Sequence, residues 1–344
     1  MGLLTVTGTL PLDQFWPTGE SDADTAKVLV AVAPDAFQFQ TDAGTPARPT
    51  QVFDQGKVKG MFGTKAVIDN KGRLTIRFQG IDATELHYRP SPLSKAQKAQ
   101  MTAAQLAKFK TLNKQYRQFF GETATSQLHD LLVGAGVADI PCQVTTAVNL
   151  PNEVFDIYGR FIGDIHVNIG QNEINLNKWL VEEGWALPTF YNSMSAEEIN
   201  LLLTATQTGR QKPNRLWKHL RKTVGQFDRS LLFRGKGAAL NPAADIGSVL
   251  MPKLFRRLCT FSIYRQVGIV SGNFHTYLKN ANPRDGCFLT ADFLDQGASA
   301  APVHFLDEFV GADGKISKQP HELVFREKPS TLVGPGGKKI KKWW

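Results

Sequence analysis

The sequence contains little cysteine and no long apolar run. Its 344 residues include only three cysteines, Cys142, Cys259 and Cys287. Their wide spacing and odd number exclude a zinc knuckle and a disulfide framework, so we expect reduced thiols. The longest purely aliphatic run, residues 28–33, is far too short to cross a bilayer. We therefore expect no membrane span. The seven histidines lack metal-ligand spacing, so we also expect no transition-metal site.

The amino terminus lacks the features of a secretory signal. Residues 1–6 alternate like a strand and have neither a basic start nor an apolar core followed by a small-residue cleavage site. This predicts a cytoplasmic protein. The net charge of +9 favours a polyanionic partner such as nucleic acid, because cations that neutralise phosphates release bound counterions. The charge alone does not identify a binding site.

The length predicts two domains with separate cores. A stretch rich in glycine and alanine at residues 234–242 predicts a linker at 223–246, between a domain at 1–222 and another at 247–344. The second domain is predicted to be β-rich or mixed α+β, with β-type runs near 259–270, 287–293, 303–309 and 322–325. The lysines and tryptophans of residues 338–344 predict a disordered tail, although such a tail could also contact nucleic acid, a membrane surface or a protein groove.

The most informative stretch is residues 76–85, where an alternating strand runs into two acids. Strand alternation directs Ile76 and Phe78 to one face and Arg77 to the other. Arg77 can therefore reach a site bordered by Asp82 and Glu85. A cation facing two carboxylates is an arrangement suited to phosphate chemistry.

Two further patterns lie on either side of this strand in the sequence. The acidic turn at residues 21–25 contains Asp24, and Asp-x-Tyr-Gly-Arg at 156–160 places Arg160 just before another strand. Residues 174–186 form a helical pattern that is capped by Gly184. Taken alone, each pattern is a common turn, strand or helix feature.

Together and in this order, the patterns resemble the staphylococcal nuclease-like family. The resemblance covers about residues 1–222, with insertions at about 37–72 and 86–118. Residues 33–37, instead of 21–25, could be aligned with the family's acidic turn. We reject this alignment because it puts Phe37 where a carboxylate belongs. The resemblance implies a mainly β fold with α-helices, namely a closed five-stranded barrel of the OB type with packed helices. No family resemblance is found for the second domain.

The second insertion reads as one basic helix over residues 94–118 that includes Lys95 and Lys98. In compact family members a mobile loop beside the active site occupies this place. A cationic helix there could guide a nucleic-acid strand, or it could simply be a solvated helix face. Lys95 and Lys98 are therefore predicted as substrate-binding residues.

The resemblance also implies a chemistry. It implies one calcium ion held by Asp24, Asp82 and the backbone carbonyl of Ala83, all hard oxygen ligands. Glu85 would be held through water and act as the general base, while Arg77 and Arg160 would stabilise charge on the phosphate. Tyr158 and Tyr191 would bind substrate. Departures from the family pattern, such as Ala23 for glycine and Ile157 for lysine, put substrate affinity and preference in question more than the reaction.

We therefore predict a calcium-dependent phosphodiesterase that hydrolyses DNA or RNA and is controlled by its second domain or by a regulatory protein partner. One alternative is a nucleic-acid-binding or scaffold protein with an inactive nuclease fold. Another is an interaction protein whose second domain recruits a partner while the first serves as a platform. The sequence leaves the oligomeric state undetermined.

Overall fold

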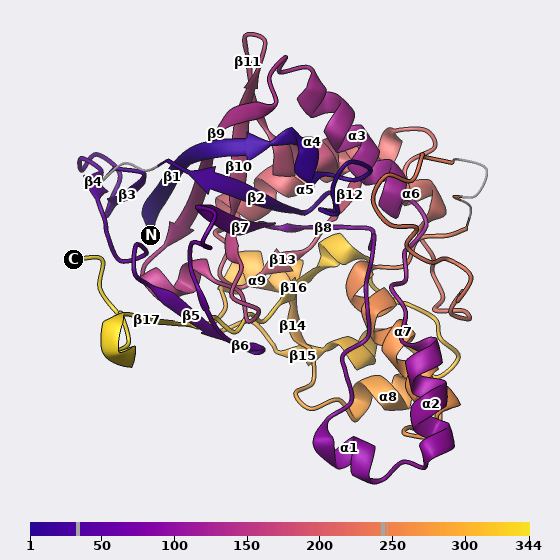
Figure 1. Cartoon of the computed structure of the whole chain (residues 1–344). Helices are drawn as coiled ribbons and strands as arrows, with labels where there is room; N and C mark the ends of the chain where they lie inside the picture. The colour runs from indigo at the N-terminus through magenta and orange to yellow at the C-terminus, as the bar shows by residue number, and fades with distance from the viewer. Residues whose placement is uncertain (32–34, 242–244, 246) are drawn as a thin grey trace.

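The central feature of the computed structural model is a closed barrel (Figure 1). The structure describes residues 1–31, 35–241, 245 and 247–344. The barrel strands are β1 (Gly2–Pro11), β2 (Thr25–Val30), β7 (Arg73–Phe78), β9 (Asp139–Val148) and β10 (Phe161–Ile169). Pairing runs from β1 to β2, β7, β10, β9 and back to β1, and only the β7–β10 pair is parallel. The predicted five-stranded OB-type barrel is confirmed.

Strand alternation fills the barrel interior. Along β1, Leu4, Val6 and Leu10 are wholly buried, while Leu3, the residue before Leu4, is exposed. The alternative alignment at residues 33–37 follows β2, and its first two residues, 33 and 34, lie outside the described residues. The inward rings and aliphatic side chains of the barrel form the larger of two apolar clusters.

Helices cover one side of the barrel (Figure 1). They are α3 (Gly121–Val133), α4 (Leu176–Glu182), α5 (Ala196–Gln211) and α6 (Leu216–His219). Helix α5 begins with a capping box, in which the Ser195 hydroxyl accepts the Glu198 N–H while the Glu198 carboxylate accepts the Ser195 N–H. The short strands β8 (Ile81–Ala83) and β12 (Ala186–Pro188) pair beside these helices, and β11 (Asn172–Asn175) pairs antiparallel with β10.

The first insertion forms strands outside the barrel. Strands β3 (Phe37–Gln40) and β4 (Arg48–Pro49) extend the sheet beyond β1, and β5 (Lys57–Gly60) and β6 (Gly63–Ala66) form a hairpin. The hairpin gains a third strand from near the end of the chain, β17 (Thr331–Val333).

The single helix predicted over residues 94–118 is wrong. The structure has two short helices, α1 (Lys95–Ala99) and α2 (Ala103–Leu112). Thr102 separates them because its hydroxyl accepts the Gln105 N–H and begins a new capping box. A residue in this extended N-cap conformation cannot also continue the preceding helix.

The carboxy-terminal part is mixed α+β, one of the two compositions predicted. Its helices are α7 (Pro252–Gln266), α8 (Phe274–Lys279) and α9 (Thr290–Gln296), and its strands are β14 (Gly286–Leu289), β15 (His304–Phe305) and β16 (Leu323–Phe325). The β-type run predicted at 259–270 is wrong, since most of it belongs to α7. Proline at the first helical position and a buried face that includes Leu254, Leu258 and Phe261 favour the helix.

The carboxy-terminal part is also joined to the rest of the molecule. Strand β16 pairs with β13 (Phe190–Tyr191), which follows β12 in the chain. The second apolar cluster combines Phe109 of α2 with residues of α7 and α8. Short 3-10 helices complete the fold at η1 (Leu12–Gln14), η2 (Pro151–Val154), η3 (Leu306–Phe309), η4 (Pro320–Glu322) and η5 (Pro335–Gly337). Within the described part of the chain, every helix is too short or too polar to span a bilayer.

Two segments predicted to be loose are packed. In the predicted linker, Arg234 donates to Glu122 at 2.9 Å and Asp245 accepts from Thr123 at 2.7 Å, while residues 242–244 and 246 lie outside the described residues.

The predicted disordered tail is wrong at Trp343. Its ring is buried and stacks on Phe39 with centroids 3.9 Å apart, because an indole ring gains more from the barrel's apolar surface than it loses in chain entropy.

Candidate active site

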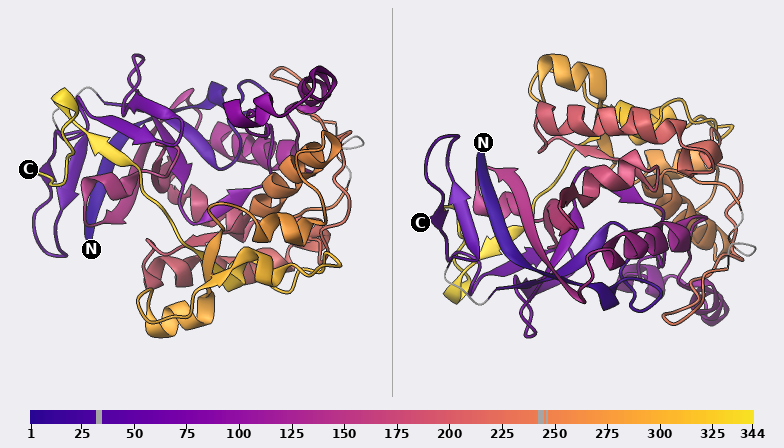
Figure 2. Two further views of the ribbon diagram at one scale, coloured as in Figure 1. Left: turned by 90° about the horizontal axis from the view of Figure 1, so that it is seen from below. Right: turned by 90° about the horizontal axis from the view of Figure 1, so that it is seen from above.

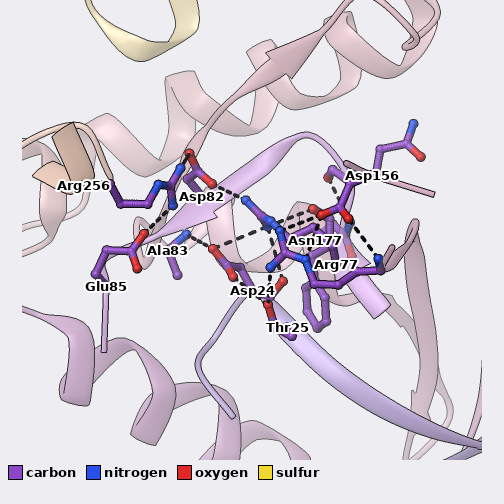
Figure 3. A network of polar contacts seen from close by, with 12 residues as sticks. Asp24, Thr25, Arg77, Asp82, Ala83, Glu85, Asp156, Asn177 and Arg256 are labelled. Carbon is purple, nitrogen blue, oxygen red and sulfur yellow. Dashed lines mark hydrogen bonds and ion pairs between the residues drawn. The ribbon is translucent and has the colours of Figure 1, made fainter. Parts of the chain in front are cut away.

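The candidate active site lies where β2, β7 and β8 meet (Figure 3). Thr25 at the start of β2 pairs with Arg77 of β7, so Asp24 just before β2 lies beside Arg77. Gly80 has a φ of 73°, a left-handed conformation that lets the chain turn sharply after β7. The chain then enters β8, which brings Asp82 back to Arg77.

Arg77 joins two of the predicted metal ligands. One of its terminal nitrogens lies 3.4 Å from Asp24 Oδ2, and the other contacts Asp82 Oδ1. The same Asp24 oxygen accepts the Ala83 N–H at 2.8 Å. Asp82 is fully buried and Arg77 is only 8% exposed. Arg77 is therefore already engaged with protein acceptors before any substrate is present.

Arg160 reaches Asp24 through one hydroxyl. Its Nε and one terminal nitrogen donate to Asp156 Oδ2 at 2.8 and 2.7 Å. The other Asp156 oxygen accepts the backbone N–H groups of Tyr158 and Arg160, which holds the turn. The remaining terminal nitrogen of Arg160 lies 3.4 Å from Thr25 Oγ1, and that hydroxyl donates to Asp24 Oδ1 at 3.2 Å.

Arg256 of α7 is a third arginine in the site. One of its terminal nitrogens contacts Glu85 Oε1, and the other lies 3.4 Å from Asp82 Oδ2. Figure 3 shows the guanidinium lying against both carboxylates. Its side chain is 30% exposed. The carboxy-terminal part of the chain thus supplies a cation to the acids of the barrel.

These charges set the ionisation of the two acids. Burial would raise the pKa of Asp82, but the positive charges of Arg256 and Arg77 outweigh it and lower the pKa below its ordinary value. For Glu85 burial prevails over Arg256, and its pKa is raised. Asp82 is thus held as an anion, while Glu85 binds a proton more readily than an exposed glutamate.

Sequence reasoning missed two members of this site. Asp22 has a buried oxygen without a hydrogen-bond partner, and burial together with the negative charge of Asp24 raises its pKa to about 7. Its position two residues before Asp24 was the available signal. Arg256 lies 171 residues after Glu85, in a helix whose second half the sequence predicted as a β-type run, and no local pattern indicated it.

The predicted substrate-binding residues are not all close to the site. Tyr158 is half exposed, and its ring centroid lies 5.5 Å from the Arg160 guanidinium carbon. Tyr191 of β13 lies within electrostatic reach of Asp82, Arg77 and Arg256. Lys95 and Lys98 belong to α1, which lies at the bottom of Figure 1, away from β8. Their role in substrate binding stays a prediction.

Calcium does not fit this arrangement. Asp24, Asp82 and Glu85 have the hard oxygen atoms that calcium prefers, but guanidinium groups contact at least one oxygen of each. Among the residues that the structure describes, no group of three or more acid, histidine or cysteine side chains is placed to hold a metal ion. Ala83 faces Asp24 with its N–H rather than its carbonyl.

The arginines of the site have the chemistry for binding a phosphate. Arginine forks that now contact carboxylates have the geometry to contact phosphate oxygens instead.

Residues 75–219 match the family model described as staphylococcal nuclease homologue, and no curated protein matches the chain. The match covers less than half of the chain and includes Arg77, Asp82, Glu85 and Arg160, but not Asp24. Residues 75–219 are therefore similar to a staphylococcal nuclease homologue domain, and the closed barrel agrees with that similarity.

Proposed function

We propose that this domain hydrolyses phosphodiester bonds of DNA or RNA. The observation that supports the proposal is that Arg77 contacts both Asp24 and Asp82. The Thr25 hydroxyl links Arg160 to Asp24. These residues come from separate parts of the chain, and a merely structural ion pair does not need two arginines around one carboxylate cluster. Perturbed ionisable groups gathered in this way are typical of catalytic sites.

Each residue has a proposed role. Arg77 and Arg160 bind the phosphate and stabilise the extra negative charge of the transition state. Glu85 accepts the proton of the attacking water. A polynucleotide is the proposed partner, and the cytoplasmic location and a regulatory protein partner stay predictions.

The calcium dependence implied by the resemblance requires a rearrangement. A divalent cation would compete with Arg256 for oxygen atoms of Asp82 and Glu85. We therefore propose that Arg256 holds the site in a closed state and must withdraw before a divalent cation binds. This is one physical way in which the carboxy-terminal part can control a nuclease.

A second candidate is an inactive fold that serves as a nucleic-acid-binding or scaffold protein. The observation that favours it is the engagement of both Arg77 and Arg160 with carboxylates of their own chain. If Arg256 never withdraws, the acids stay neutralised and the site does not work. The two candidates differ in what removal of Arg256 does.

The test is hydrolysis of single-stranded DNA, duplex DNA and RNA by the full chain, with calcium, magnesium or a chelator. Arg77→Ala, Glu85→Gln and Arg160→Ala should abolish cleavage without unfolding the protein. Arg256→Ala should raise the rate roughly 10- to 150-fold, because hydrogen bonds to charged groups contribute roughly 1.5–3 kcal/mol. It should also bind calcium more tightly by calorimetry, a readout independent of cleavage.

Arg257→Ala is the matched control. Arg257 is the next residue of α7, but it pairs with Asp285 at 2.8 Å rather than with the site, so its removal should leave rate and calcium affinity unchanged. Absence of cleavage in both the wild type and Arg256→Ala, with all three metal conditions, would favour the inactive scaffold. Loss of cleavage on removing Arg256 would show that it takes part in the reaction and would overturn the closed-state proposal.

A further inference from the structure

The β5–β6 hairpin lies beside the turn that carries Arg160. It belongs to the first insertion and falls outside the residues that match the family model. The Met61 N–H at its tip donates to the Ile157 carbonyl at 2.7 Å. A Cβ on Gly60 would lie only 2.8 Å from the same carbonyl oxygen, so the hairpin and the turn touch backbone to backbone.

The hairpin tip and the turn present a pair of exposed rings. Phe62 is 71% exposed and Tyr158 is 45% exposed. The two rings stack, with centroids 5.6 Å apart and planes 24° apart. A phenylalanine this exposed loses most of the free energy that burial would provide, and a stacked aromatic surface open to solvent is suited to an unpaired base.

One lysine, Lys65, lies on the same side of the hairpin as these rings. Lys65 is the cross-strand partner of the buried Val58, so both point toward the turn. A Cβ on Gly159 would lie 3.0 Å from Lys65 Cε. Lys59 is paired with Thr64 and points to the opposite face.

A continuous set of contacts links the rings to the acids of the site. The Arg160 guanidinium lies 5.5 Å from the Tyr158 ring centroid. Its terminal nitrogen lies 3.4 Å from Thr25, whose hydroxyl donates to Asp24. A polynucleotide with one phosphate at Arg160 would therefore pass the rings with a neighbouring nucleotide.

We propose that Phe62, Tyr158 and Lys65 form a binding site for single-stranded polynucleotide, with a base on the ring pair and a phosphate near Lys65. The site selects single strands, because a base within a duplex is already stacked and does not offer its face. The inference rests on the proposed function for its orientation toward Arg160, but binding does not require cleavage.

The test is binding of fluorescein-labelled oligothymidylate and oligouridylate to the full chain, measured by fluorescence anisotropy in the presence of a chelator. Base–aromatic stacking contributes roughly 1–3 kcal/mol, so Phe62→Ala should weaken binding of both single strands roughly 5- to 150-fold. Lys65→Ala should also weaken it and reduce its salt dependence. Binding of a blunt duplex of similar length should change little in either variant.

Lys59→Ala is the matched control, since it removes the same charge from the opposite face of the same hairpin. An equal loss of binding in Lys59→Ala and Lys65→Ala would mean that net charge alone accounts for the effect, and it would contradict the proposed binding site. Unchanged binding in Phe62→Ala would also overturn it and leave the ring pair to a protein partner. These outcomes can be distinguished from failure of the proposed function. Single-strand binding that depends on Phe62, without any cleavage, would support the binding site and contradict the proposed hydrolysis.

Discussion

Asp164 is a residue whose ionisation affects the stability of the barrel. It lies in β10, close to Glu198 and to the side-chain amides of Asn175 and Asn177. Burial, with a smaller contribution from the Glu198 charge, raises its pKa to about 7 from an ordinary value of 3.8. Its carboxyl group is therefore protonated in the folded chain at pH values where it is ionised in the unfolded chain.

This shift predicts a pH-dependent stability. Between about pH 4 and pH 7 the folded chain binds more protons at Asp164 than the unfolded chain, so the free energy of unfolding falls as pH rises. Asp164→Asn removes this component, and its stability relative to the wild type should increase over that interval and level off above it. Urea unfolding at several pH values checks this, with the exposed Asp139→Asn as control. A constant difference from the wild type would contradict the shift.

Some residues of the site were predictable from the sequence and others were not. Arg77, Asp82 and Glu85 lie within a few positions of one another, so strand alternation and a turn were enough to place them together. Arg256 and Phe62 reach the site and its border through packing between distant segments. Such contacts depend on tertiary structure, and no periodicity in one sequence encodes them.

At the scale of elements, the accuracy of sequence reasoning followed local signals. The alternating strand β1 was predicted because propensity and pattern agreed there. The second half of helix α7 was predicted as a β-type run because Phe261, Ile263 and Tyr264 favour strands locally. Its burial against α2 and α8 decided otherwise.

The β5–β6 hairpin allows a prediction at this scale. Gly60→Ala should separate the hairpin tip from the turn, because the added Cβ would lie 2.8 Å from the Ile157 oxygen and 3.1 Å from the Tyr158 carbonyl carbon. Neither is the end of a flexible side chain. The Met61 amide should then exchange its hydrogen faster, and single-strand binding should fall as in Phe62→Ala.

Thr64→Ala is a suitable control for Gly60→Ala. Thr64 lies in the same hairpin and is exposed. It pairs with Lys59, so both side chains lie on the face of the hairpin that points away from the turn. It should leave both the exchange rate of the Met61 amide and single-strand binding unchanged. An unchanged exchange rate in Gly60→Ala would mean that the backbone contact with the turn does not hold the hairpin in place.

At the scale of the whole molecule, the carboxy-terminal part wraps around the barrel (Figure 2). Strand β16 pairs with β13, β17 pairs with β5, and Arg256 reaches the acids of the site. The division into domains at 1–222 and 247–344 stays a proposal. Sequence composition could suggest a linker, but it could not show that segments beyond the linker return to the first part of the chain.

The end of the chain provides the test of this wrapping. Trp343 is 6% exposed, stacks on Phe39 and meets the edge of Phe53 at 6.0 Å between centroids. Its indole N–H donates to the Asn149 carbonyl at 2.8 Å. Truncation of a buried aromatic side chain costs roughly 3–5 kcal/mol, so Trp343→Ala should lower the free energy of unfolding by about that amount in urea unfolding of the full chain.

Trp344→Ala is the matched control for the final contact. Trp344 is the neighbouring residue of the same type, but it is 60% exposed, and surface substitutions usually change stability by no more than about 0.5 kcal/mol. The comparison separates docking of one ring from general effects of removing tryptophan. Equal and small effects of the two substitutions would contradict a docked terminus. A large effect of Trp343→Ala alone would mean that the last residues of the chain stabilise the barrel formed by its first half.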